Sequence, residues 1–292
     1  MNGILCIDKP QEMTSFVACA RVRRLLGIKK TGHTGTLDPM ATGVLPVLCG
    51  NATRALDWLP SHDKRYTVTV RFGMTSDTQD IWGAVEETRG TLPTAEAVEE
   101  ALARFRGEIQ QIPPMMSAIK KDGVRLYELA RRGIEIEREP RTVTIHTLDL
   151  LSFDGDTAVL DCACSKGTYM RSIADDLGRA LGCGALMSGL RRTEAVGFSL
   201  ADTHTFDDLA AAVENGTAAD LILPTDRLLS CYPAVTVTAA QANRFRNGGA
   251  LSLDRLREEV TDTVRVYDPD NLFLGLGKPQ DDLLTIARLF LS

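Results

Sequence analysis

The sequence has no apolar run close to the roughly 20 residues that a membrane-spanning helix needs. Its amino terminus also lacks the features of a secretory signal, because the apolar run there is short and is followed at once by Asp8 and Lys9. These two absences argue against a membrane protein and against a secreted one. We therefore expect the protein to be cytoplasmic.

Motifs for cofactors and metals are missing as well. We find no dinucleotide-binding fingerprint and no Walker loop, and the seven cysteines are scattered without a Cys-x-x-Cys pair. Cys162 and Cys164 alternate in a strand-like segment with no histidine nearby, which is typical of small buried hydrophobic residues. We expect reduced thiols, no bound metal and no cofactor.

The chain has no overall excess of positive charge. Its formal net charge is -6, which argues weakly against nucleic acid as a partner. The basic residues are nevertheless concentrated in two segments, although each could also be an ordinary solvated face. These residues are Arg21, Arg23, Arg24, Lys29 and Lys30, and then Lys120, Lys121, Arg125, Arg131, Arg132, Arg138 and Arg141. Local charge therefore favours contact with RNA. No heptad seam is present, so we expect a monomer.

The most informative stretch that is present is the loop over residues 31–54. It contains four glycines and several threonines, followed by the apolar run from Val44 to Cys49. Glycine allows close backbone approach, and threonine hydroxyls tie a loop to itself. Asp38 is a carboxylate within this rigid loop, which makes it a candidate site residue. Because Pro39 follows, Asp38 also has the pattern of a helix N-cap.

Hydrophobic periodicity predicts the surrounding elements. Strands are predicted at 3–7, 66–72 and 159–164, and helices at 15–26, 94–106 and from 169 onward, the last capped by Thr168. The polar loop 76–80 is interpreted as turn capping by its two aspartates. Beyond Pro224 the pattern changes to short alternating runs at 235–238, 264–267, 272–276 and 284–287, which predict a separate small β module.

Arg171 occupies an unusual position in this scheme. It falls in the first turn of the predicted helix, where the helix dipole disfavours a cation by roughly 0.3 to 1 kcal/mol. An arginine placed there has a reason to face an anion, although a plain surface arginine is the alternative. Tyr66, at the head of its apolar strand face, is on the strand pattern alone better interpreted as a core tyrosine whose hydroxyl finds a partner.

The segment Gly-His-Thr-Gly-Thr-Leu-Asp-Pro-Met-Ala-Thr-Gly-Val-Leu-Pro, residues 32–46, resembles the signature of the TruB family, the tRNA uridine-55 pseudouridine synthases. Further motifs follow in order: Lys-Pro-x-x-x-Thr-Ser at 9–15, Lys-Arg-Tyr at 64–66, Ser-Lys-Gly-Thr-Tyr-Met-Arg at 165–171, and the segment 186–192. The pattern at 267–277 resembles the PUA-like domain of bacterial members. Two positions depart from the family: Glu12 replaces a glycine, and Met116 replaces an aromatic residue.

The resemblance implies an α+β fold, with a central mixed, largely antiparallel sheet flanked by helices and a small β-rich PUA-like domain. It implies a catalytic domain over 1–228, with an RNA-contacting insertion at about 113–142, and an RNA-binding domain over 229–292. The implied activity is isomerisation of uridine-55 in the T arm of tRNA, which is redox-neutral and needs no cofactor. The implied partner is the T-arm stem-loop.

By the same resemblance, Asp38, Tyr66 and Arg171 are the catalytic residues. Asp38 pairs with Arg171 and acts as nucleophile or as proton acceptor, and Tyr66 stacks on the flipped uracil. The substrate-binding residues are His33, Thr36, Lys64, Lys120, Tyr127, Tyr169 and Leu190. His33 fills the space that the flipped base leaves, or merely hydrogen-bonds the loop, and a general-base role is the least favoured interpretation. Leu190 closes the pocket or is simply core.

Two other classes of function use the same residues. One is an RNA-binding or RNA-folding protein whose pocket holds a flipped uridine without chemistry. The other is a hydrolase using His33 and Asp38, although no serine or cysteine stands at a motif position beside them.

Overall fold

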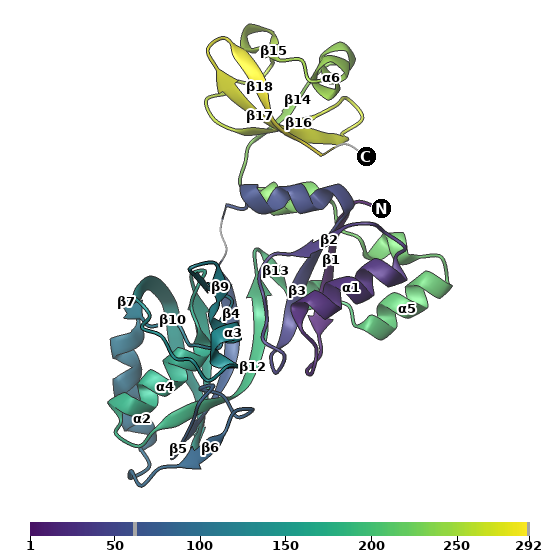
Figure 1. Cartoon of the computed structure of the whole chain (residues 1–292). Helices are drawn as coiled ribbons and strands as arrows, with labels where there is room; N and C mark the ends of the chain where they lie inside the picture. The colour runs from purple at the N-terminus through teal and green to yellow at the C-terminus, as the bar shows by residue number, and fades with distance from the viewer. Residues whose placement is uncertain (61–62, 291–292) are drawn as a thin grey trace.

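The computed structural model describes residues 1–60 and 63–290 and is built around a nine-stranded sheet (Figure 1). The strand order is β1-β3-β12-β4-β11-β10-β7, with β2 beside β3 and β13 beside β12. β12 pairs with β3 in parallel, and the other neighbours are antiparallel. The bounds are β1 Gly3–Lys9, β2 Thr31–His33, β3 Thr42–Cys49, β4 Lys64–Phe72, β7 Gly107–Gln111, β10 Arg141–Asp154, β11 Thr157–Cys164, β12 Ala185–Ala195 and β13 Phe198–Ser199. The predicted mixed, largely antiparallel sheet is confirmed.

Four helices bury their apolar stripes against one face of this sheet, the face that also carries the buried Tyr66. They are α1 Ser15–Leu25, α2 Ala95–Leu102, α4 Met170–Ala180 and α5 Phe206–Glu214. Thr14 caps α1 by accepting a hydrogen bond from the Val17 amide, and Gly27 follows the helix with φ +62°, as its sequence predicts. The thiols Cys162 and Cys164 are buried in the same core, as expected.

A second, smaller sheet forms the C-terminal module, drawn in yellow and green in Figure 1. Its strand order is β14-β16-β17-β18-β15, and it has its own apolar core. The bounds are β14 Ala234–Thr236, β15 Leu251–Ser252, β16 Val264–Tyr267, β17 Phe273–Gln280, β18 Leu283–Leu289 and α6 Ala239–Arg246. Leu276 and Phe290 of this module belong to the same apolar cluster as Ile4 and Leu48 of the main sheet, so apolar side chains connect the two bodies.

Two local predictions need correction. The strand predicted at 235–238 is β14, but it ends at Thr236, because Thr238 accepts a hydrogen bond from the Gln241 amide as the N-cap of α6. Thr168 does not cap α4, because its hydroxyl donates to the carbonyl of Ser165 and Tyr169 occupies the cap position. In both cases a threonine side chain has a choice of backbone partners that periodicity does not resolve.

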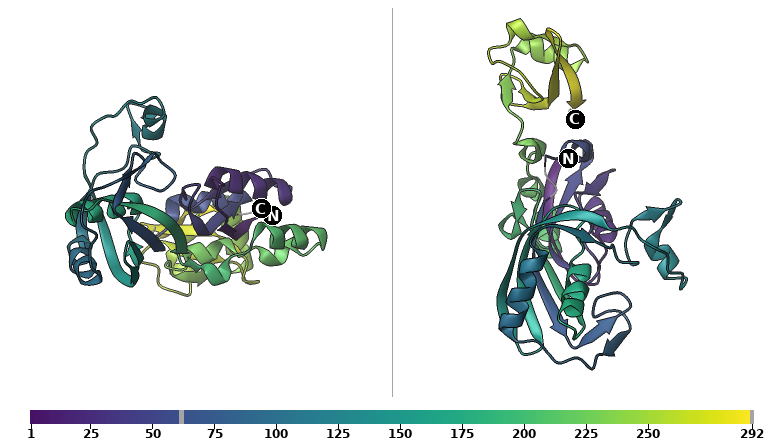
Figure 2. Two further views of the ribbon diagram at one scale, coloured as in Figure 1. Left: turned by 90° about the horizontal axis from the view of Figure 1, so that it is seen from below. Right: turned by 90° about the vertical axis from the view of Figure 1, so that its left-hand side faces the viewer.

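The segment between β7 and β10 projects from the body of the protein (Figure 2). It contains the short hairpin β8 Lys120–Lys121 and β9 Val124–Arg125, followed by α3 Leu126–Ala130. A second hairpin, β5 Met74–Ser76 and β6 Val85–Glu87, follows β4. Among the helices of the described ranges, none is long and apolar enough to cross a bilayer.

Candidate active site

The loop that carries Asp38 is held by buried groups from other segments. The Ser15 hydroxyl accepts from the Leu37 amide at 2.8 Å and lies 3.1 Å from the Leu37 carbonyl, to which it donates. The Lys9 ammonium donates to the carbonyl of Pro39 at 3.5 Å. Asp38 does not cap a helix, because residues 39–41 form only a turn, closed by the Ala41 amide on the Asp38 carbonyl. The loop is therefore positioned by neighbouring elements and not by a helix of its own.

Arg171, near the start of α4, faces the Asp38 carboxylate. Its Nη2 lies 3.0 Å from Oδ2 of Asp38. The arginine side chain is only 4% exposed, whereas that of Asp38 is 36% exposed. Arg171 also donates to the backbone carbonyls of Met116 at 2.9 Å and Thr78 at 3.3 Å. The cation is thus fixed by three segments, and the carboxylate is the member of the pair that remains open to a substrate.

Asp80 belongs to this cluster, which the sequence did not indicate. Its Oδ2 lies 3.8 Å from Nε of Arg171, and the residue is buried. Its other oxygen accepts from the Trp82 amide and the Thr78 hydroxyl, so the turn-capping interpretation is correct but incomplete. An aspartate in a polar turn carries no sequence signal that separates these two uses.

Tyr66 lies on β4 on the same side of the sheet as the helices. The residue is 7% exposed, and desolvation raises the pKa of its phenol to about 12, although the nearby Arg192 guanidinium opposes this rise. Tyr169 is half-buried, and burial raises the pKa of its hydroxyl. The backbone of Tyr169 is held on both sides by Gln111, whose amide oxygen accepts from its N–H at 2.8 Å and whose amide nitrogen donates to its carbonyl at 3.1 Å.

Arg192 is the second residue that sequence reasoning missed. It lies on β12, is 0% exposed, and donates to the carbonyls of Gly35 and Val44 at 3.1 and 2.7 Å. Its guanidinium lies close enough to Tyr66 to oppose the rise in the phenol pKa that burial causes, and its Nη1 donates to the carbonyl of Thr36 at 3.5 Å. A charged residue at a fully buried strand position is a rare feature, but its burial is visible only once the register of β12 is known.

His33, Thr36, Lys64 and Leu190 lie around the same loop. Nδ1 of His33 is buried without a hydrogen-bond partner. The pKa of its imidazole is lowered from 6.5, mainly by burial and secondly by the nearby Arg192 guanidinium. Thr36 is exposed, and Lys64 packs so closely that a Cβ on Gly35 would lie 3.1 Å from its Cε. Leu190 packs against the main core beside Val68.

Lys120 and Tyr127 lie on the projecting insertion, outside the cluster around Arg171. The Tyr127 ring is flanked by two guanidinium groups, with Arg131 and Arg125 centred 5.4 and 5.8 Å from it. The insertion is tied to the cluster through its backbone, because the Met116 carbonyl accepts from Arg171. That contact uses the backbone of residue 116, so it is kept although methionine replaces the aromatic residue that the family has at this position.

The other departure, Glu12, also preserves its local structure. Its backbone has φ +62°, the left-handed region that glycine enters without strain, and its amide donates to the Pro39 carbonyl at 2.9 Å. The turn therefore still contacts the Asp38 loop.

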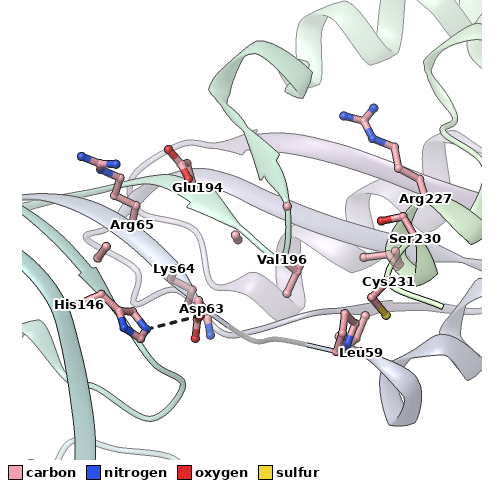
Figure 3. A pocket seen from close by; sticks show the side chains of 15 residues that line it. Leu59, Asp63, Lys64, Arg65, His146, Glu194, Val196, Arg227, Ser230 and Cys231 are labelled. Carbon is pink, nitrogen blue, oxygen red and sulfur yellow. Dashed lines mark ion pairs between the residues drawn. The ribbon is translucent and has the colours of Figure 1, made fainter. Parts of the chain in front are cut away.

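A hollow of about 490 Å³ lies where β4 and β12 meet the segment 227–231 (Figure 3). Lys64, Arg65 and His146 are among the residues that line it. Two of its basic side chains are paired with carboxylates, Arg65 with Asp161 at 2.7 Å and His146 with Asp63 at 3.5 Å. Neither Asp38 nor Arg171 lines this hollow, so we assign the chemistry to the Asp38 loop. Within residues 1–60 and 63–290 no group of histidine, cysteine and carboxylate side chains is placed to hold a metal ion.

Three family models match consecutive parts of the chain. The N-terminal domain model of the TruB family of pseudouridylate synthases matches residues 23–170. The C-terminal domain model of tRNA pseudouridylate synthase B matches residues 171–230, and a C-terminal model of pseudouridine synthase II TruB matches residues 233–290. Together these matches extend over nearly all of the chain.

Individual proteins give the same result. A tRNA pseudouridine synthase B from Chromobacterium violaceum is 44% identical over 283 residues, which cover 97% of this chain and 92% of that protein. Another from Burkholderia pseudomallei is 45% identical over 296 residues, covering 100% of this chain and 98% of that protein. The crystal structure of a Cbf5-Nop10-Gar1 complex matches with a TM-score of 0.75 and 25% identity, covering 99% of this chain and 85% of that one.

Proposed function

Because the chain belongs to the TruB family of pseudouridylate synthases, we propose that its substrate uridine is uridine-55 in the T arm of tRNA. The chain is an isomerase that converts uridine in tRNA to pseudouridine. The observation that carries the site assignment is the Asp38 carboxylate, 36% exposed and held 3.0 Å from a buried Arg171.

The reaction breaks the bond between N1 of uracil and C1′ of ribose, turns the base, joins C5 to C1′ and removes the proton from C5. A base stacked in RNA is not accessible, so the nucleotide must first leave the stack at a cost of a few kcal/mol. An acid at the surface of a rigid loop is suited to either route, attack as a nucleophile or acceptance of a proton. Arg171 supplies the fixed positive charge that holds this carboxylate in one place.

The other residues act around that carboxylate. Tyr66 stacks on the uracil and removes the C5 proton, while Tyr169 and Leu190 line the pocket. His33 occupies the space that the flipped base vacates, and its burial without a partner for Nδ1 and its lowered pKa support an uncharged filling role over one as a general base. Thr36 and Lys64 contact the RNA beside the loop.

The remaining residues act on the RNA outside the pocket. Lys120 and Tyr127 close over the stem-loop from the insertion, and Lys120 is exposed there. We divide the chain into a catalytic unit over 1–228 and a PUA-like RNA-binding unit over 229–292. We also propose that the protein acts as a monomer in the cytoplasm, where its tRNA substrate is found.

The test uses an unmodified tRNA transcript tritiated at C5 of uridine, incubated with the protein and no cofactor. Formation of pseudouridine releases the C5 tritium of the modified uridine to water. A transcript with cytidine in place of uridine-55 should release no tritium. Asp38→Asn should bind the transcript with nearly unchanged affinity and release no tritium above background. The matched control is Asp156→Asn, which removes one carboxylate from an exposed pair with Arg71 and should retain the wild-type rate.

The outcomes separate the candidate functions. Wild-type protein that binds the transcript without releasing tritium would support a binding protein without chemistry. Release of free uracil would support a hydrolase. Wild-type turnover by Asp38→Asn would refute the assignment of the essential carboxylate.

A further inference from the structure

The fully buried Arg192 is a cation without a carboxylate partner among the ion pairs of the described ranges. Removing a charge from water costs several kcal/mol even after the protein relaxes around it. Its guanidinium is compensated by the carbonyls of Gly35 and Val44 and by Tyr66. All of these groups belong to the Asp38 loop, to the strand that follows it, or to the strand of Tyr66.

The sheet register explains why Arg192 reaches both sides. On β12, Arg192 pairs with Gly43 of the parallel strand β3 and with Tyr66 of the antiparallel strand β4. Gly43 is required for this close approach, since a Cβ there would lie 2.2 Å from the Arg192 carbonyl oxygen. Arg192 therefore lies between the strand that ends the Asp38 loop and the strand that carries Tyr66.

We propose that Arg192 is a positioning residue of the isomerisation, which fixes the Asp38 loop relative to Tyr66 and stabilises negative charge on the Tyr66 oxygen. This inference rests on the proposed function of Tyr66. Tyr66, as phenolate, accepts the proton from C5 after the new C5–C1′ bond has formed. The electrons of the broken C5–H bond form the C5=C6 double bond, the former C6=N1 pair moves to N1, and N1 takes a proton from solvent. Burial raises the pKa of the Tyr66 phenol to about 12, and the Arg192 guanidinium acts against that rise, so it favours the phenolate that this step requires.

A purely structural role makes a different prediction. If Arg192 only satisfies the loop carbonyls, replacing it should have the same effect whether or not residue 66 has a hydroxyl. If it acts through Tyr66, the effect should depend on that hydroxyl. A double-mutant cycle between Arg192→Lys and Tyr66→Phe distinguishes the two, because lysine keeps the charge but lacks the planar fork of donors.

The experiment measures the single-turnover rate of pseudouridine formation on tRNA transcripts carrying either hydrogen or deuterium at C5 of uridine. Arg192→Lys should lower the rate about 10- to 100-fold, with RNA affinity unchanged within about threefold, and should raise the isotope effect at C5. In the Tyr66→Phe background, the fold-decrease in rate caused by Arg192→Lys should be at least about fivefold smaller than in the wild-type background. The control is Arg106→Lys, which also replaces an arginine that donates to a backbone carbonyl, that of Leu148, and should keep the wild-type rate and isotope effect.

Equal costs of Arg192→Lys in the two backgrounds would overturn the proposal. A second test does not require any Arg192 variant to fold: Tyr66→Phe alone should slow the reaction and show a C5 isotope effect. A Tyr66→Phe protein with the wild-type rate and isotope effect would equally overturn it. Failure of the proposed function is recognised separately, because wild-type protein would then form no pseudouridine at all.

Discussion

Replacing Arg171 with methionine removes the charge at the centre of the cluster while keeping much of the side-chain volume. The wild-type guanidinium lies 3.0 Å from Asp38 and 3.8 Å from Asp80, and it donates to the carbonyls of Met116 and Thr78. Arg171→Met therefore leaves two carboxylates and two carbonyls without this partner. The Asp80 side chain is only 11% exposed, so little water can replace the lost contact there.

The size of the effect follows from these contacts. Breaking a buried ion pair by removing one member costs about 3–5 kcal/mol. Asp38 is partly hydrated, so the free energy of unfolding should fall by about 3 kcal/mol, at the lower end of that range. Losing one preorganised charge at a reacting centre costs about 10²–10³-fold in rate. Because Arg171 is nearly inaccessible, RNA affinity should change by less than about threefold, or about 0.7 kcal/mol.

Urea unfolding, single-turnover formation of pseudouridine and filter binding of the transcript measure the three quantities. The control is Arg179→Met on the same helix, where an arginine pairs with Asp175 at 2.9 Å but is 74% exposed. Asp175 is only 9% exposed but keeps a hydrogen bond from Gln79, and the arginine is open to water, so the loss should be about 1 kcal/mol and the rate should not change. A folded Arg171→Met protein whose rate stays within about threefold of wild type, less than the loss of a preorganised charge allows, would refute the catalytic role of the pair.

Two further predictions concern the supports of the Asp38 loop. The pKa of Lys9 is lowered from 10.5 to about 8 by burial, so between these values the unfolded chain holds a proton that the folded chain has released. The free energy of unfolding of wild type should therefore rise from pH 8 to pH 10.5 relative to that of Lys9→Met. Urea unfolding of both proteins at pH 8 and pH 10 measures this difference. The same pH dependence in the two proteins would contradict the prediction. Glu12→Gly should raise the midpoint temperature of unfolding. Relief of the left-handed backbone strain at residue 12 is worth roughly 1–2 kcal/mol, and the greater conformational entropy of the unfolded glycine variant offsets part of this gain. A lowered midpoint would show that the Glu12 side chain contributes more than the strain costs.

The sequence predicted the elements whose side chains follow a clean period. Helix α1 was predicted at both ends because Thr14 and Gly27 are strong terminal signals, and β4 was predicted because Tyr66 heads a strict alternation. The proximity of Asp38 and Arg171 was expected from a cation in a first helical turn together with the family resemblance. Each of these predictions depends on a signal in the local sequence, such as a helix-capping residue or a strand alternation.

The residues missed by the sequence depend on contacts between distant segments. Asp80 has the ordinary pattern of a turn residue, and its distance to Arg171 is set by how the turn between β5 and β6 lies against α4. Arg192 escaped notice because β12 has irregular register between Met187 and Gly189 and again between Arg192 and Glu194. These irregularities shift the alternation, so sequence period alone does not identify Arg192 as an inward-facing residue.

In the site that we propose, the group that faces the substrate differs from the groups that hold it. Asp38 is the partly exposed member of its pair, whereas Arg171 and Arg192, which fix it and its loop, are nearly inaccessible. On this proposal a buried cation contributes to the rate by keeping the carboxylate in one position without contacting the RNA, because the cost of ordering is met during folding. Substitutions at Arg171 and Arg192 should therefore change the rate of chemistry with little effect on RNA affinity, whereas substitution of the exposed Lys120 on the insertion should change affinity first. The opposite pattern, with lost binding at Arg171 and lost chemistry at Lys120, would mean that the insertion and not the Asp38 loop holds the reacting base.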